Sequence, residues 1–220
     1  SGHTDTPPVH AVTPPGGIRP GTVGPPLPNL EVRIADDGEV LARGPNIMHG
    51  YFERPDETRA AIIDGWFHTG DIGALDEKGY LSITDRKKEL LVTSGGKKIA
   101  PQPIEERLRA DPLVNEAMIV GDRRHFPAAL IAPNFHALAA RLGVDHHAVR
   151  SRVGADEVRA IYQAIVDEVN RHLAQFERIK KFELVPEEFS VATGELTPTL
   201  KIKRRVVLDK YRSVIEGMYS

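Results

Sequence analysis

The spacing of apolar residues changes character at Asp85, and this change constrains the fold more than any single motif. Before it, residues 30–34 and 40–42 flank an Asp-Asp-Gly turn, and residues 73–76 and 80–83 flank a Glu-Lys-Gly turn. Short apolar segments on either side of such turns predict two β-hairpins.

Beyond this point strand and helix patterns are mixed. Apolar residues between Val158 and Phe176 recur at steps of three and four, which is typical of an amphipathic helix. The apolar runs 116–120 and 128–132 predict two paired strands, and residues 182–185 predict a further strand. Apolar residues between Val206 and Ile215 predict a terminal helix.

The predicted fold class is therefore α+β, with a boundary at residues 84 and 85. Residues 1–84 form a small β-rich unit with one short helix that begins at Pro55, because proline is tolerated in the first turn of a helix. Residues 85–220 form a compact α+β unit.

Composition excludes several classes of function. Lys and Arg number 29 against 31 Asp and Glu, and a net charge of −2 argues against a dedicated nucleic-acid binder. The absence of cysteine excludes disulfides, thiolate zinc sites and a cysteine nucleophile. Because neither a long apolar run nor a secretion signal is found, we expect a cytoplasmic protein, with peripheral membrane contact left open.

The first 28 residues are unusual for the start of a domain. They hold eight of the 17 prolines and five of the 19 glycines, and the chain begins with Ser1 rather than with Met. Proline disfavours regular structure, so this segment is predicted to be loop or polyproline-like strand. It is either a disordered leader or a loop that belongs to a larger protein.

Residues 65–71 form the first motif that could carry chemistry, with the sequence Gly-Trp-Phe-His-Thr-Gly-Asp. The alternation predicts a strand with Asp71 at its exposed end. A carboxylate in such a place can accept two hydrogen bonds from a vicinal diol such as a ribose. On the residues alone, an aspartate that binds nearby backbone N–H groups is the simpler interpretation.

Residues 83–98 form the second motif, in which five basic residues surround a short strand and the turn Ser94-Gly95-Gly96. Glycines let a backbone approach a ligand closely, and nearby lysines favour anions. The segment does not match the P-loop pattern. The alternative interpretation is a solvated charged hairpin.

The third motif is a Thr-Pro-Thr segment at 197–199 that leads to Lys201. An ammonium group aimed by this segment could neutralise phosphoryl charge in a transition state. The alternative is a basic helix start exposed to water. Six basic residues against one acid in 201–212 keep an RNA-binding or anionic-membrane-binding module open as a rival function. Since no metal-ligand spacing or serine-nucleophile motif is present, we expect neither.

The order and spacing of these motifs resembles the adenylate-forming acyl-activating superfamily. The matching segments are 65–71, then Gly-Tyr-Leu-Ser-Ile-Thr-Asp-Arg-Lys-Lys-Glu-Leu at 79–90, then Ser-Gly-Gly-Lys-Lys-Ile-Ala-Pro at 94–101, then the near-terminal Lys201. Residues 79–90 and the segment around Lys201 look most like long-chain fatty acyl-CoA synthetases. The resemblance runs from about Gly17 to the end of the chain.

The resemblance implies that residues 1–84 are the end of a large N-terminal domain and that 85–220 are a mobile C-terminal domain. The chain would then be a fragment of an AMP-forming long-chain fatty acid–CoA ligase, inactive alone because it lacks the family's phosphate loop. An aryl-CoA ligase or a carrier-loading adenylation domain stays open within the family. The implied substrates are fatty acid, ATP and CoA, with Mg²⁺ ligands expected in the part that precedes this chain.

The resemblance also implies roles for individual residues. Asp71 would bind the ribose hydroxyls of ATP or AMP, Arg86 would approach the ribose or the phosphates, and Lys88 would be the hinge. Three further residues would form the loop that lines the CoA tunnel: Ser94, Gly95 and Gly96.

Lys201 would be the catalytic lysine that reaches the α-phosphate. Many family members carry glycine just before this lysine, whereas this chain has Leu200. The departure leaves Lys203 as the alternative for this role.

Overall fold

The computed structural model describes residues 11–13 and 17–220, which form two compact units, Ser1–Glu89 and Leu90–Ser220. Most of the proline-rich start, residues 1–10 and 14–16, lies outside the described residues. The two units divide after Glu89, and the strand that contains residue 84 continues to pair as far as Arg86.

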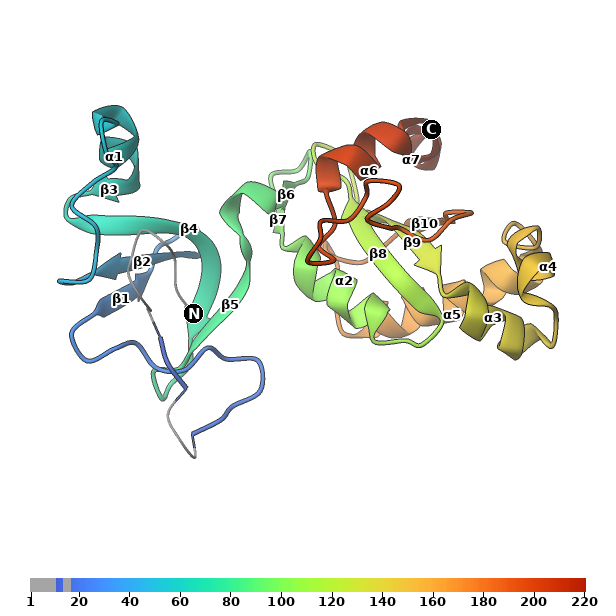
Figure 1. Cartoon of the computed structure of the whole chain (residues 1–220), viewed down its shortest axis with the longest axis horizontal. Helices are drawn as coiled ribbons and strands as arrows, with labels where there is room; N and C mark the ends of the chain where they lie inside the picture. Colours follow the sequence, from blue (N-terminus) through green and yellow to red (C-terminus); the bar gives the residue numbers. More distant parts are fainter. Residues whose placement is uncertain (1–10, 14–16) are drawn as a thin grey trace. The chain divides into compact units, whose positions relative to one another are not determined.

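The first unit is built on an antiparallel sheet (Figure 1). Its order is β1 (Glu31–Ile34), β2 (Glu39–Arg43), β4 (Trp66–Leu75) and β3 (Ile62–Ile63), and β5 (Leu81–Arg86) pairs with the end of β4. The helix α1 (Pro55–Ala61) has proline in its first turn, as predicted. Both predicted hairpins, β1–β2 and β4–β5, are confirmed.

The second unit begins with the short hairpin β6 (Leu91–Val92) and β7 (Lys98–Ile99), followed by α2 (Pro101–Arg109). Its central sheet has the order β10 (Lys181–Leu184), β9 (Ala128–Pro133) and β8 (Val114–Val120). β8 and β9 are paired, as predicted for these two apolar runs; the pair is antiparallel, and β10 runs parallel to β9.

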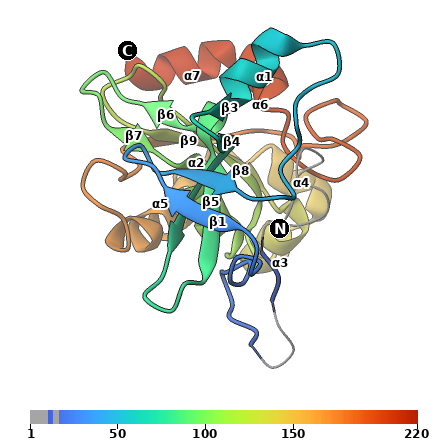
Figure 2. The same cartoon turned by 90° about the vertical axis from the view of Figure 1, so that its left-hand side faces the viewer.

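Helices cover both faces of this sheet. Successive strand residues point to opposite sides, and here the residues on both sides are apolar and need a covering layer. Ala117 and Ile119 of β8 pack in one core with α2, α3 (Phe135–Leu142) and α5 (Asp156–Arg171). Met118 and Val120 pack in a second core with α6 (Arg204–Lys210) and α7 (Arg212–Tyr219). The α+β fold class is thereby confirmed. α4 (His146–Arg150) lies beside α3, as Figures 1 and 2 show.

Two helix predictions need correction. The apolar stripe from Val158 to Phe176 extends beyond the helix, since α5 ends at Arg171 and Phe176 lies in the following turn with 42% of its surface exposed. The predicted terminal helix is divided at Tyr211 into α6 and α7, and the buried Tyr211 side chain packs against Phe189 at the division.

Candidate functional site

Asp71 and Arg86 face each other across the β4–β5 pair. The register aligns them directly, and the Arg86 Nε atom lies 2.9 Å from Asp71 Oδ1. Asp71 is buried, whereas half of the Arg86 side chain is exposed. Asp71 therefore lies within a strand, next to a bulge after Ile72, and not at an exposed strand end as the sequence suggested.

A second carboxylate in the same unit, Glu39 on β2, was not predicted to be important. It is 3% exposed and accepts hydrogen bonds from the Lys87 ammonium (2.8 Å), the His68 imidazole (2.8 Å) and the Gly70 N–H (3.0 Å). Burial alone would raise the pKa of Glu39, but these partners lower it. Lys87 also pairs with Asp37 at 2.8 Å, so the chain is bound to the sheet immediately before Lys88.

Lys88 lies in a single 3₁₀ turn, Lys87–Glu89, that ends the first unit. Its side chain is exposed. β5 and the Lys87 ion pairs hold the backbone that precedes Lys88.

Ser94, Gly95 and Gly96 form the turn between β6 and β7. The turn is closed by hydrogen bonds from Gly96 N–H to the Thr93 carbonyl (2.8 Å) and from Lys97 N–H to the Thr93 hydroxyl (3.1 Å). Gly96 has a φ of 76°, which glycine adopts without strain. The Ser94 hydroxyl lies 2.9 Å from His125 Nδ1, so the turn is attached to the β8–β9 loop.

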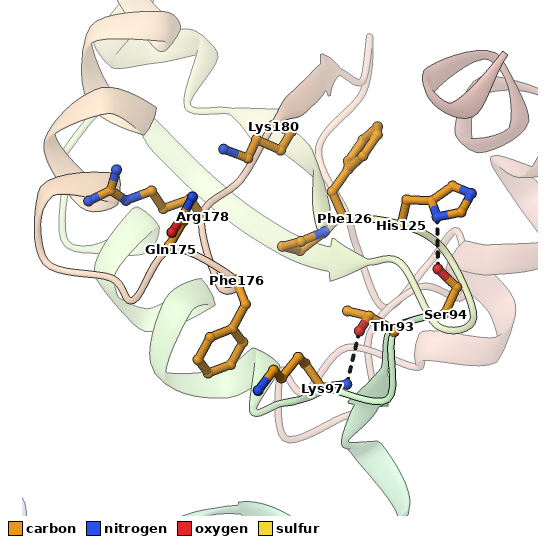
Figure 3. A pocket seen from close by; sticks show the side chains of 11 residues that line it. Thr93, Ser94, Lys97, His125, Phe126, Gln175, Phe176, Arg178 and Lys180 are labelled. Atoms are coloured by element: carbon orange, nitrogen blue, oxygen red, sulfur yellow. Dashed lines mark hydrogen bonds between the residues drawn. The ribbon is translucent and has the colours of Figure 1, made fainter.

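A pocket of about 380 Å³ opens beside this turn (Figure 3). It combines basic side chains, a histidine and the exposed ring of Phe176, over which the Lys97 ammonium lies at 5.8 Å, and no carboxylate is among the described residues that line it. The lining residues are Thr93, Ser94, Gly95, Lys97, His125, Phe126, Pro127, Gln175, Phe176, Arg178 and Lys180. Such a lining favours an anionic ligand that carries a flat ring.

Lys201 projects from a tight hairpin in the second unit. Thr197 N–H donates to the Lys201 carbonyl (2.8 Å), and Lys201 N–H donates to the Thr197 hydroxyl (3.0 Å). Leu200 has a φ of 60°, which is the left-handed conformation that glycine would adopt there. Leu200 therefore closes the kind of turn that glycine would form at this position, and the Lys201 side chain that follows it is exposed.

Three of the six basic residues in 201–212 form ion pairs. Arg204 pairs with Glu105, Lys210 with Glu195, and Arg212 with Asp209. These pairs offset part of the charge on which the RNA-binding or membrane-binding alternative depended.

Sequence reasoning missed the polar pocket residues His125, Arg178 and Lys180, and it also missed three carboxylates, Glu39, Glu105 and Glu195. Each of these carboxylates is buried and bonded to a cation. A weak signal existed for Glu39, since it directly precedes three apolar residues in its strand.

Within 11–13 and 17–220, no group of three or more His, Cys, Asp or Glu side chains could hold a metal ion. Across the same residues, no helix combines the length and the apolar character that crossing a bilayer requires.

Comparison with known proteins places these motifs in a family. The model of the AMP-binding enzyme C-terminal domain matches residues 88–220. The long-chain-fatty-acid–CoA ligase FadD15 of Mycobacterium tuberculosis is 42% identical over 207 residues, which are 92% of this chain and 34% of that protein. The long-chain-fatty-acid–CoA ligase ACSBG1 of Bos taurus is 34% identical over 99% of this chain and 34% of its own length.

Among solved structures, the O-succinylbenzoate coenzyme A synthetase MenE of Bacillus subtilis, in complex with AMP, superposes with a TM-score of 0.66 at 26% identity. The match covers 93% of this chain and 39% of that one. The chain thus spans about a third of the length of the curated relatives it matches. The family model covers the whole second unit and begins at residue 88, and the chain belongs to the AMP-binding enzyme C-terminal domain family.

Proposed function

We propose that this chain is the C-terminal part of an AMP-forming long-chain fatty acid–CoA ligase, which activates a fatty acid with ATP and transfers it to CoA. The names of FadD15 and ACSBG1 support the ligase class and its fatty acid substrate. The AMP bound to the structurally similar MenE supports a nucleotide as substrate. The observation that carries the proposal is the cationic pocket beside Ser94 and Gly95.

In the first half-reaction a carboxylate oxygen of the fatty acid attacks the α-phosphorus of ATP, and pyrophosphate leaves. Asp71 accepts hydrogen bonds from the ribose hydroxyls, and Arg86, already 2.9 Å from Asp71, directs its remaining N–H groups at the nucleotide. The Lys201 ammonium neutralises charge that develops on the phosphoryl oxygens.

In the second half-reaction the CoA thiolate attacks the acyl carbonyl, and AMP leaves. We assign Lys88 as the hinge whose rotation exchanges the Lys201 hairpin for the turn 94–96. Gly95 and Gly96 leave room for the thiol-bearing arm. The phosphates and the adenine of CoA are held by the pocket, because Arg178 and Lys180 supply positive charge and Phe176 supplies an exposed ring.

Mg²⁺ accompanies ATP in such reactions. The described residues do not form an acidic cluster that fits the ion, so no step of the proposal is routed through it in this chain. Because this chain carries no phosphate loop, we also expect it to form no acyl-CoA by itself.

The first test uses the full-length protein that contains this chain. Lys201→Ala should abolish adenylate formation, measured by pyrophosphate exchange, and largely spare thioester formation from supplied acyl-adenylate. Lys203→Ala tests the alternative residue for this role and should keep both half-reactions, and Arg205→Ala, at an exposed position with no assigned role, is the matched control. Equal loss of both half-reactions in Lys201→Ala would contradict the role of Lys201.

The second test measures CoA binding to this chain by calorimetry. Arg178→Ala and Lys180→Ala should each weaken binding by about tenfold, as expected when a charge-assisted hydrogen bond to phosphate is lost. Lys181→Ala is the control, because Lys181 is exposed on β10 but does not line the pocket. Unchanged affinity for CoA in both pocket variants would show that the pocket does not bind CoA and would contradict the proposal.

A further inference from the structure

Arg204, three residues after Lys201, is held by hydrogen bonds to a carboxylate and to a backbone carbonyl. Its Nη1 atom donates to Glu105 Oε1 at 2.6 Å, and its Nη2 atom donates to the carbonyl of Ile119. Glu105 is 5% exposed, and the same Oε1 atom accepts the N–H of Ile119 at 2.7 Å. One ion pair therefore joins α2, β8 and the first residue of α6.

The segment between Lys201 and Arg204 transmits this restraint to the hairpin. Ile202 forms a β-bridge with Leu196, and the Lys203 N–H donates to the Glu195 carbonyl at 2.7 Å. The two strands of the hairpin are thus hydrogen-bonded to each other from its tip to the start of α6. Few backbone dihedral angles between Lys201 and Arg204 are left free to rotate.

The other end of α6 is held in a similar way. Lys210 Nζ lies 2.6 Å from Glu195 Oε1, and Glu195 is fully buried and also accepts the Thr193 hydroxyl. Two buried carboxylates therefore fix the register of a seven-residue helix that is too short to be stable alone.

Burial makes these pairs suited to holding a position. An exposed pair contributes little, since water and salt screen it, whereas a buried pair is costly to break because one charge is then left unpaired. Neither Glu105 nor Arg204 has a part in the mechanism proposed above. A shift of about 1 Å at a reacting group can reduce a rate by about 100-fold, so the anchoring of the hairpin bears directly on Lys201.

We propose that Arg204 and Glu105 are positioning residues, whose buried ion pair fixes the Lys201 hairpin in the geometry needed for adenylate formation. This inference rests on the function proposed for Lys201. It adds two residues that act on the reaction only through the placement of Lys201.

The test compares Arg204→Lys with Arg205→Lys in the full-length protein. Lysine keeps the charge but cannot bond Glu105 and Ile119 together, whereas Arg205 is an exposed neighbour. Arg204→Lys should lower kcat of adenylate formation at least tenfold, leave KM for ATP within threefold, and leave thioester formation from supplied adenylate within twofold. Arg205→Lys should match the unmodified protein.

Glu105→Gln and the double variant complete a cycle, in which the double variant should be no slower than the slower single variant. In this 220-residue chain, hydrogen exchange should show lost protection of the Lys201 and Lys203 amides in Arg204→Lys, and retained protection in β8.

The outcomes separate this inference from the proposed function. If Lys201→Ala abolishes adenylate formation but Arg204→Lys does not slow it, the positioning role is wrong and the function of Lys201 stands. If Arg204→Lys lowers both half-reactions equally, the pair supports the fold in general and the inference is overturned. If Lys201→Ala leaves adenylate formation intact, the role of Lys201 and the positioning role that depends on it are both wrong.

Discussion

The two units hold their candidate functional groups in different ways. In the first unit Asp71 and Arg86 lie on paired strands, and the register of β4 and β5 aligns them. In the second unit Lys201 and the turn 94–96 lie at hairpin tips, which depend on contacts with distant segments. A site on paired strands is thus positioned by local hydrogen bonding, whereas a site on a turn needs separate anchors.

The largest effect should come from breaking the strand-held pair. Asp71→Asn keeps the shape of the side chain but removes the charge that faces Arg86. Adenylate formation in the full-length protein, measured as kcat/KM for ATP, should fall about 100-fold, because a hydrogen bond to a charged group is lost in the transition state. Asp36→Asn, at an exposed turn, is the control. A loss below threefold would argue against a nucleotide role for Asp71.

The next effect concerns an anchor in the second unit. Although burial alone would raise the pKa of Glu195, hydrogen bonds from Lys210 and Thr193 lower it to about 2 from 4.5. Since the folded pKa is depressed, the stabilisation is present above pH 4.5 and is lost as pH falls towards 2. In urea unfolding of this chain we expect it to be about 2 kcal/mol, and Glu195→Gln should flatten the dependence in this pH range. An unchanged pH profile in the variant would show that another group is responsible.

A smaller effect separates the fold of the 94–96 turn from its function. Gly96→Ala should lower the free energy of unfolding by about 1 kcal/mol, because a φ of 76° strains any residue with a Cβ atom. Gly95→Ala should leave stability unchanged, since the nearest atom to an added Cβ is 4.0 Å away. If the turn lines the CoA passage, Gly95→Ala should still raise KM for CoA. Normal CoA kinetics in Gly95→Ala would separate this turn from the CoA path.

The smallest effect is expected at an exposed pair on the same sheet as Asp71. Glu31 and Arg43 are aligned across β1 and β2 at 2.6 Å, but both are largely solvent-exposed. Replacing Glu31 with Gln should shift the urea midpoint only marginally, and about 1 M NaCl should remove the shift. A large shift of the urea midpoint that salt does not reduce would show that alignment on paired strands makes even an exposed ion pair strongly stabilising.

Local patterns predicted the parts of the fold that depend on neighbouring residues. The hairpins β1–β2 and β4–β5 follow from turn residues between alternating segments, and α5 follows from its apolar stripe. The end of α5 was misplaced because Phe176 continues the spacing but lies in a turn.

The anchors could not be predicted from such patterns. Arg204 and Glu105 are 99 residues apart, and acidic residues are rarely buried unless they are paired. The pairing becomes visible only when α2, β8 and α6 are packed together. The placement of Asp71 within a strand was missed for a related reason, since its Thr-Gly-Asp segment has the composition of a turn.

The ion pairs of Lys87 have a mechanical consequence. Lys87 is bonded to Asp37 and Glu39, and the strand before it carries Arg86 opposite Asp71. If the small domain turns at Lys88 as proposed, the pivot adjoins the strand that carries Arg86 opposite Asp71, the two residues proposed to bind the nucleotide. Under that proposal the nucleotide would lie in a stationary frame while Lys201 and the turn 94–96 exchange places at it.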